Sequence, residues 1–249
     1  MSILKACIIA FGTYSKFPVP YFEWKEKDMK YSVCFFPFVG LLLGAAEWLW
    51  FWFCVNYGMG SFFKAAGAVI INILFTGGIH IDGYMDTMDA LHSYQPVEKK
   101  LEILKDAHIG AFAVIMLSVL LMAYLGALPE IEFNNIPLLV STFVFSRILS
   151  GLSVVLFKGA KKDGMLYAFS SSAQKKAVCI SLVIEFLLMA SLVIWFYKIK
   201  AVFVISIMLL VFIYYRYKSY KEFGGITGDL AGWFLCLSEI AAVITCVFI

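Results

Sequence analysis

Runs of apolar residues long enough to cross a lipid bilayer recur along this chain. Hydrophobic residues make up 62% of the sequence and charged residues only 15%. A helix needs about 20 apolar residues to span the hydrocarbon core. These runs are continuous rather than alternating, which favours helices over the strands of a membrane barrel. We therefore predict an all-α fold, a polytopic integral membrane helical bundle of about seven transmembrane helices with interfacial and cytoplasmic helices.

Local signals divide the chain into these helices. The expected spans cover residues 32–56, 62–76, 110–128, 136–157, 177–197, 201–215 and 229–249. A short interfacial helix is expected over 3–19, and an amphipathic helix is expected to start at Pro96 with Ser93 as its N-cap. The basic segments 158–176 and 216–228 are expected to be loops. We predict one membrane-embedded catalytic domain over residues 1–249, with the lipid bilayer as a partner and nucleic acid excluded. A homo-oligomer remains open.

Lysine and arginine gather in alternate connections between the expected spans. One set holds Lys5, Lys16, Lys25, Lys27, Lys30, Lys99, Lys100, Lys105, Lys158, Lys161, Lys162, Lys175, Lys176, Arg216, Lys218 and Lys221; the other holds Lys64, Lys198 and Lys200. Cytoplasmic loops carry the excess of positive charge. The pattern predicts a protein of the cytoplasmic (inner) membrane of a prokaryote, with its N-terminus and its active site facing the cytoplasm.

The acidic stretch from Gly77 to Ser93 stands out from the apolar background. Asp82, Asp86 and Asp89 fall at i, i+4 and i+7, so a helix would place all three on one face. Three like charges on one stripe repel each other. A bound cation is the simplest compensation, and clustered carboxylates favour Mg²⁺ or Mn²⁺. The alternative interpretation is a solvated acidic face at the end of a helix.

Two further features point to a polar site. The segment Gly224-Gly225-Ile226-Thr227-Gly228-Asp229 is dense in glycine, so its backbone amides could approach a phosphate. It could equally be a turn that caps the last helix. Arg147 lies inside an apolar span, where a charge needs a partner or a polar cavity. It could hold a phosphate, or pair with Glu185 or Glu239.

Aspartates that bind magnesium, beside basic and glycine-rich segments, are typical of phosphoryl transfer. The metal neutralises developing charge, and a carboxylate or histidine can accept the proton of the nucleophile. The residues therefore predict a membrane-bound, magnesium-dependent phosphotransferase and leave its substrate open.

The chain resembles the cobalamin synthase family, also called adenosylcobinamide-GDP ribazoletransferase. The matching segments, in order, are Phe17-Pro18-Val19-Pro20, Phe35-Phe36-Pro37-Phe38-Val39-Gly40, Gly77-Gly78-Ile79-His80-Ile81-Asp82-Gly83 with Asp86-Thr87 and Asp89, Lys99 to Asp106, Ile109-Gly110-Ala111-Phe112, Ser146-Arg147, and Gly224 to Asp229. Together they cover nearly the full length. His108 departs from the pattern, because many members carry arginine there, and Ala90 replaces a common glycine.

The resemblance implies an activity and roles for the residues. Adenosylcobinamide-GDP would transfer its adenosylcobinamide-phosphate group to α-ribazole or α-ribazole 5′-phosphate, releasing GMP and forming adenosylcobalamin or its 5′-phosphate. Mg²⁺ would be the cofactor. The implied metal ligands are Asp82, Asp86, Asp89, Asp106 and Asp229, and the expected catalytic residues are Asp82, Asp89 and His80. The expected substrate-binding residues are Lys105, His108, Arg147, Gly224, Gly225, Thr227 and Gly228.

Two other functions are compatible with parts of the pattern. A CDP-alcohol-type phospholipid phosphotransferase also uses aspartate-rich helices, but its D-G-x-x-A-R run lacks the arginine here, because Asp82-Gly83 is followed by Tyr84-Met85-Asp86-Thr87. An ion-coupled secondary transporter would line an ion path with Asp82, Arg147 and Glu239. No inverted repeat is evident, and carboxylates gathered at one face favour a surface site.

Overall fold

The structure, a computed structural model, describes residues 3–20 and 22–249. Apart from an isolated bridge between Gly159 and Ile226, the regular elements of these residues are all helices. The α-helices are α1 (Ile3–Tyr14), α2 (Glu26–Met29), α3 (Phe36–Asn56), α4 (Ser61–Thr76), α5 (Ile79–His92), α6 (Val97–Ile103), α7 (Ala111–Ala127), α8 (Ile136–Leu156), α9 (Gly164–Ser172), α10 (Lys175–Tyr197), α11 (Ile199–Phe223) and α12 (Gly228–Val247). Three short 3-10 helices cover Ser32–Phe35, Leu128–Glu130 and Phe133–Asn135. This confirms the predicted all-α class.

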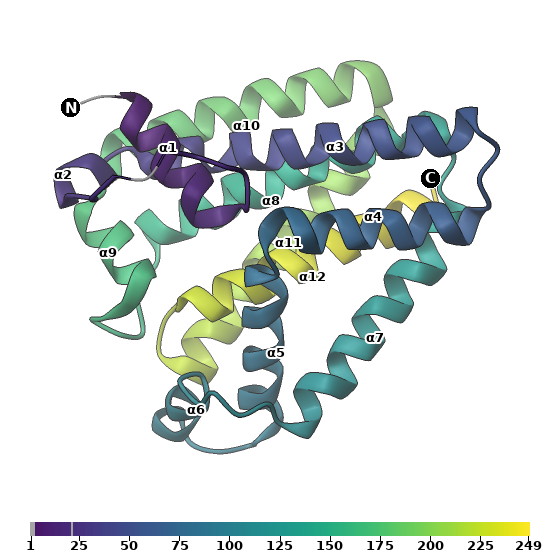
Figure 1. Cartoon of the computed structure of the whole chain (residues 1–249). Helices are drawn as coiled ribbons and strands as arrows, with labels where there is room; N and C mark the ends of the chain where they lie inside the picture. Colours follow the sequence, from purple (N-terminus) through teal and green to yellow (C-terminus); the bar gives the residue numbers. More distant parts are fainter. Residues whose placement is uncertain (1–2, 21) are drawn as a thin grey trace.

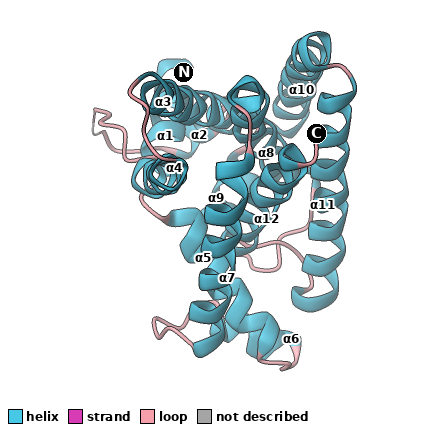
Figure 2. Ribbon diagram, turned by 90° about the vertical axis from the view of Figure 1, so that its right-hand side faces the viewer, coloured by secondary structure: helices cyan, strands magenta, loops and turns pink. Residues whose placement is uncertain are grey.

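Helices α8 and α12 form the centre of the bundle (Figure 1, Figure 2). Of the apolar 18-residue stretch in the segment that contains α8, 89% is buried. The corresponding share is 17% for α7 and 22% for both α10 and α11. Small residues account for this position, because they let neighbouring helices approach closely. On α3, Gly40 faces α8 so closely that a β-carbon there would lie 2.3 Å from the Phe143 carbonyl oxygen. The outer helices α7, α10 and α11 expose their apolar side chains.

The count of membrane-crossing segments agrees with the sequence. Six helical segments, those containing α3, α7, α8, α10, α11 and α12, are long and apolar enough to cross a bilayer. Helices α4 and α5 pass the same test together, but the chain bends by 94° between them. The protein is thus a polytopic helical membrane protein with up to seven spans.

The bend between α4 and α5 has a local cause. Gly77 and Gly78 both have positive φ, at 66° and 78°, a conformation that other residues rarely adopt. The left-handed pair ends α4 and starts α5 in a new direction. Figure 1 shows α5 running at right angles to α4, away from the end of the bundle toward α6. The pair α4 and α5 is therefore a broken span or a re-entrant segment.

Contacts between the connections show which of them lie at the same end of the bundle. The amide of Gln174 donates to the carbonyl of Lys30 at 3.1 Å, and the ammonium group of Lys105 lies 3.3 Å from the carboxylate of Asp163. On the opposite face, Lys200 donates to the side chain of Asn135 at 3.3 Å. The acidic helix, α6, α9 and the glycine-rich turn therefore lie on one face, as the alternation of spans predicted.

Several predicted boundaries were wrong. The segment 158–176 is not only a loop, because α9 forms within it, and α11 continues to Phe223, beyond the expected end at residue 215. Ser93 does not cap α6. It lies at the end of α5, where its hydroxyl donates to the Ala90 carbonyl at 2.7 Å, and Pro96 is the N-cap residue of α6. The first helix ends at Tyr14 instead of residue 19.

Candidate active site

The candidate site forms where α5 crosses the start of α12. Gly83 allows this close crossing, because a β-carbon at Gly83 would lie 2.8 Å from the carbonyl oxygen of Asp229 and 2.9 Å from its α-carbon. Asp82, which directly precedes Gly83 on α5, lines a cavity together with Asp229. Two carboxylates from segments far apart in the sequence therefore reach the same place.

The carboxylates of this crossing act on one another electrostatically. Burial raises the pKa of Asp86 to about 6, and the nearby charges of Asp82, Asp229 and Asp89 add to the rise, while Lys161 opposes it. The sequence interpretation of α5 as a helix with its aspartates on one side is confirmed by the helix itself.

Asp89 differs from the other aspartates because its carboxylate already has backbone partners. Its Oδ2 accepts a hydrogen bond from the amide of Gly110 at 2.5 Å, and its Oδ1 accepts one from Ala113 at 3.0 Å. These amides belong to the N-terminus of α7, whose dipole favours a negative charge. Asp89 thus caps α7 from a different helix. Its predicted roles in metal binding and catalysis stay predictions.

Two lysines face the acidic residues from the same side of the membrane. A cleft of about 280 Å³ is lined by Lys105, Lys161, Asp163, Thr227 and Asp229, among others. Burial lowers the pKa of Lys161, and the charges of Asp229 and Asp86 partly offset that effect. Lys105 was predicted as a substrate-binding residue. Lys161 was not, because nothing in a basic segment distinguishes the lysine that turns toward the site from its exposed neighbour Lys162.

The first half of the glycine-rich turn pairs its backbone amides within the protein. The amides of Gly224 and Gly225 donate to carbonyls of α11, at 3.2 Å in each case. A β-carbon at Gly225 would lie 2.5 Å from the Lys158 carbonyl oxygen, so this glycine permits the pairing of the turn with residues 158–160. The hydroxyl of Thr227 accepts from the Leu230 amide at 3.2 Å and caps α12. Thr227 thus caps the last helix, as the alternative interpretation expected, and the predicted substrate-binding roles of Gly224, Gly225, Thr227 and Gly228 stay predictions.

Asp106 and His108 form a local turn beyond α6. Asp106 accepts hydrogen bonds from the backbone amide of His108 at 3.0 Å and from its ring at 2.6 Å, and these bonds lower the pKa of the carboxyl group. Both side chains are exposed to solvent. Neither residue lines the cavity or the cleft at Asp229, so their predicted roles in metal and substrate binding stay predictions.

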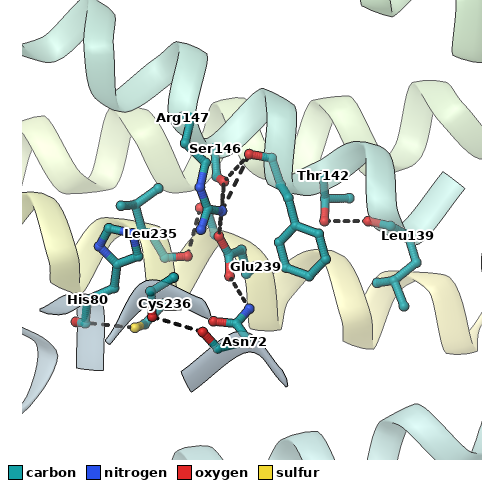
Figure 3. A network of polar contacts seen from close by, with 12 residues as sticks. Asn72, His80, Leu139, Thr142, Ser146, Arg147, Leu235, Cys236 and Glu239 are labelled. Atoms are coloured by element: carbon teal, nitrogen blue, oxygen red, sulfur yellow. Dashed lines mark hydrogen bonds and ion pairs between the residues drawn. The ribbon is translucent and has the colours of Figure 1, made fainter. Parts of the chain in front are cut away.

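Arg147 lies in a polar network inside the bundle (Figure 3). It is fully buried and pairs with Glu239 of α12, one of the two partners considered. Ser146 donates to the same carboxylate at 3.0 Å, and Asn72 of α4 reaches its other oxygen at 3.5 Å. The network ties α4, α8 and α12 together. The predicted role of Arg147 in substrate binding stays a prediction, because Arg147 does not line the cleft.

His80 lies between this network and the acidic crossing. Its side chain is 7% exposed, and its Nε2 atom has no hydrogen-bond partner. The histidine lines the cavity that also reaches Asp82 and Asp229. It is therefore next to the site without being part of the carboxylate cluster, and its predicted catalytic role stays a prediction.

Comparison with known proteins identifies the family. The family model described as cobalamin-5-phosphate synthase matches residues 6–247, which is nearly the whole chain. The chain belongs to the cobalamin-5-phosphate synthase family. This confirms the resemblance seen in the sequence motifs.

Several relatives in this family carry the same name. A protein from Lachnoclostridium phytofermentans named adenosylcobinamide-GDP ribazoletransferase is 43% identical over 97% of this chain and 93% of its own length. A relative of that name from Clostridium perfringens is 30% identical over 96% of this chain and 96% of its own length. Another, from Treponema denticola, is 33% identical over 99% of this chain and 98% of its own length. No solved structure matches the chain.

The donor atoms at the α5–α12 crossing fit the magnesium ion that the sequence predicts for this cobalamin-5-phosphate synthase family member. Among the described residues, no group of three or more His, Cys, Asp or Glu side chains could hold a metal ion by itself. Mg²⁺ does not require such a cage, because it is usually bound by one or two carboxylates together with water and substrate phosphates. Asp82, Asp86 and Asp229 offer carboxylate oxygens only, and burial, together with the charges of Asp82 and Asp229, raises the pKa of Asp86.

Proposed function

We propose that this protein is an adenosylcobinamide-GDP ribazoletransferase. A ribose hydroxyl of α-ribazole, or of its 5′-phosphate, attacks the phosphate that remains on cobinamide. The bond from that phosphate to the GMP phosphate breaks, GMP leaves, and adenosylcobalamin or its 5′-phosphate is formed. One observation carries the proposal: Asp82 and Asp229 meet between a lysine-lined cleft and an apolar cavity. The family membership and the names of the relatives support the choice of substrates.

The roles of the residues follow from their positions. Asp82, Asp86 and Asp229 would supply one or two carboxylate ligands to Mg²⁺, with water and substrate phosphates as the others. The ion, when bound, would neutralise charge that develops on the transferred phosphate. Asp82 is exposed at the mouth of the cavity and accepts the proton of the attacking hydroxyl. Lys105 and Lys161 line the cleft and stabilise the phosphate oxygens of the departing GMP. Asp89 holds α7 against α5 and so positions the acidic helix.

An assay of GMP release tests the proposal. Purified protein in detergent, supplied with Mg²⁺, adenosylcobinamide-GDP and α-ribazole, should release one GMP for each cobalamin product. Asp82→Asn should lower kcat by about a hundredfold or more, since a general base contributes at least that much. Glu132→Gln, an exposed carboxylate on the opposite membrane face, is the matched control and should retain full turnover. Absence of GMP from the wild-type reaction would contradict the proposal.

The same assay separates the two alternative functions. A CDP-alcohol phosphotransferase would instead release CMP from a CDP-linked lipid precursor, and a secondary transporter would release no nucleotide. In proteoliposomes that hold the substrates on one side of the membrane only, release of GMP would show which side the active site faces.

We further propose that the site faces the cytoplasm of a prokaryotic cell. The face with α5, α6 and α9 carries most of the lysine and arginine residues, as expected for the cytoplasmic side. A reporter fused after Ile249 should then be active outside the cytoplasm, and a reporter fused within residues 157–163 should be active inside. The reverse result would contradict the orientation and leave the chemistry untouched.

A further inference from the structure

A largely apolar cavity of about 200 Å³ adjoins the α5–α12 crossing, and the two aspartates of the crossing line it. Its walls come from α1, α3, α5, α8, α9 and α12, and include Tyr14, Phe36, His80, Val154 and Leu235. The rings of Tyr14 and Phe36 lie 4.1 Å apart between centroids. Asp82 and Asp229 also line this cavity, and Asp82 is exposed to solvent. The space therefore combines an aromatic interior with an acidic opening.

The cavity and the lysine cleft meet at Asp229, because both are lined by Gly228 and Asp229. Lysine side chains favour phosphate, whereas an aromatic interior favours a flat apolar ring. The two compartments thus differ in the chemistry that they accept. If the proposed function holds, one substrate carries a diphosphate and the other is a benzimidazole nucleoside, which has a flat apolar bicycle and one unsubstituted ring nitrogen.

His80 supplies a specific contact for such a ring. Its side chain is buried, and its Nε2 atom lacks a hydrogen-bond partner. A buried polar atom without a partner destabilises a protein unless a ligand or water satisfies it. As the Nε2–H tautomer, His80 can donate to a ring nitrogen that carries a lone pair. This bond would distinguish a heterocycle with such a nitrogen from one without it, which a purely apolar lining would not do.

We propose that this cavity is the binding site for the base of the acceptor nucleoside, with Nε2–H of His80 donating to its unsubstituted ring nitrogen. The inference rests on the proposed function. It places the ribose of the acceptor at the acidic opening, where its hydroxyl lies beside Asp82, and leaves the lysine cleft to the diphosphate of the donor. His80 is then a residue of substrate recognition instead of a proton carrier.

Filling the cavity tests the placement. Val154→Phe, with Ala231→Leu as a second variant on another wall, should raise the KM for α-ribazole by about tenfold or more and leave the KM for adenosylcobinamide-GDP within about twofold. Val183→Phe, a change of the same size on the exposed face of α10, is the control and should alter neither constant. A rise in the KM for adenosylcobinamide-GDP alone, or no change in either constant in a variant that releases GMP, would overturn the inference.

A substrate analogue tests the contact with His80. The matching indole riboside carries a C–H in place of the unsubstituted nitrogen. Wild-type protein should bind it about tenfold more weakly than α-ribazole, whereas His80→Phe should bind the two equally. Binding is measured calorimetrically in detergent without the second substrate, so the result does not depend on turnover. Equal binding of both by the wild type would overturn the role of His80, while failure of the proposed function would appear separately, as absence of GMP.

Discussion

Gly83 of α5 lies against the backbone of Asp229 of α12, so close that a β-carbon would approach the Asp229 carbonyl oxygen to 2.8 Å. This contact sets the separation of the two helices that carry the acidic residues. It makes the site sensitive to a single methyl group, because backbone atoms cannot move aside as the end of a flexible side chain can.

We expect Gly83→Ala to separate α5 from α12 and to lower kcat for GMP release by about a hundredfold, the order of loss that a misplacement of about 1 Å causes. The strain should also lower stability by about 1–3 kcal/mol. Turnover and thermal unfolding in detergent measure both effects. Gly126→Ala on α7 has open space around it and is the matched control. Full activity of Gly83→Ala would show that the crossing tolerates adjustment.

Asp89→Asn distinguishes a helix cap from a metal ligand. Asparagine offers one acceptor oxygen where Asp89 uses two, and it removes a charge from the N-terminus of α7. We expect a loss of about 1–2 kcal/mol of stability that is the same with and without Mg²⁺. Asp86→Asn should instead abolish the rise in unfolding temperature that Mg²⁺ produces. If Asp89→Asn lost only that rise, it would be a metal ligand, as the sequence predicted.

Lys161 and Lys162 form a natural pair for testing the basic cleft. Lys161 is half-buried and lines the cleft, while Lys162 is exposed. We expect Lys161→Ala to raise the KM for adenosylcobinamide-GDP by about tenfold, the effect of removing one charge-assisted hydrogen bond to phosphate. Lys162→Ala should leave the KM unchanged. Steady-state kinetics of GMP release compare the two, and equal effects would argue for a general attraction of the basic surface.

Lys100 connects α6 to the end of α11. Its ammonium group lies 2.5 Å from the carboxylate of Glu222, and the residue is 6% exposed. We expect Lys100→Met to leave Glu222 poorly compensated and to loosen α6, which hydrogen exchange over residues 97–103 would detect. Lys99→Met changes a lysine exposed to solvent and should leave exchange unaltered. Unchanged protection in Lys100→Met would mean that apolar contacts suffice to hold α6.

The features that follow a regular spacing along the chain were predicted from the sequence. Apolar length identified the spans, and the i, i+4, i+7 spacing placed Asp82, Asp86 and Asp89 on one helix. These features depend only on neighbours in sequence, so periodicity reveals them. The boundaries that were wrong, at α9 and at the end of α11, lie where polar residues form helices whose contacts are with distant segments.

Contacts between distant residues were beyond the sequence. Glu47 of α3 is 3% exposed and lines a cavity with Asn72, Tyr124 and Glu239. The choice of Glu239 over Glu185 as the partner of Arg147 likewise depends on how α8 and α10 pack. Glu185 instead accepts from Ser181 at 2.7 Å. Spacing along one helix carries no information about which neighbour faces a given residue.

The sequence by itself determined the membrane class, the acidic stripe of α5 and the family to which the chain belongs. Only the tertiary structure decided that Gly83 brings this stripe against Asp229, that Lys161 faces it, and that Asp89 caps α7. The physical reason is that helix periodicity is a local property of the backbone, whereas the meeting of two helices depends on the side chains, or their absence, at the point where they cross.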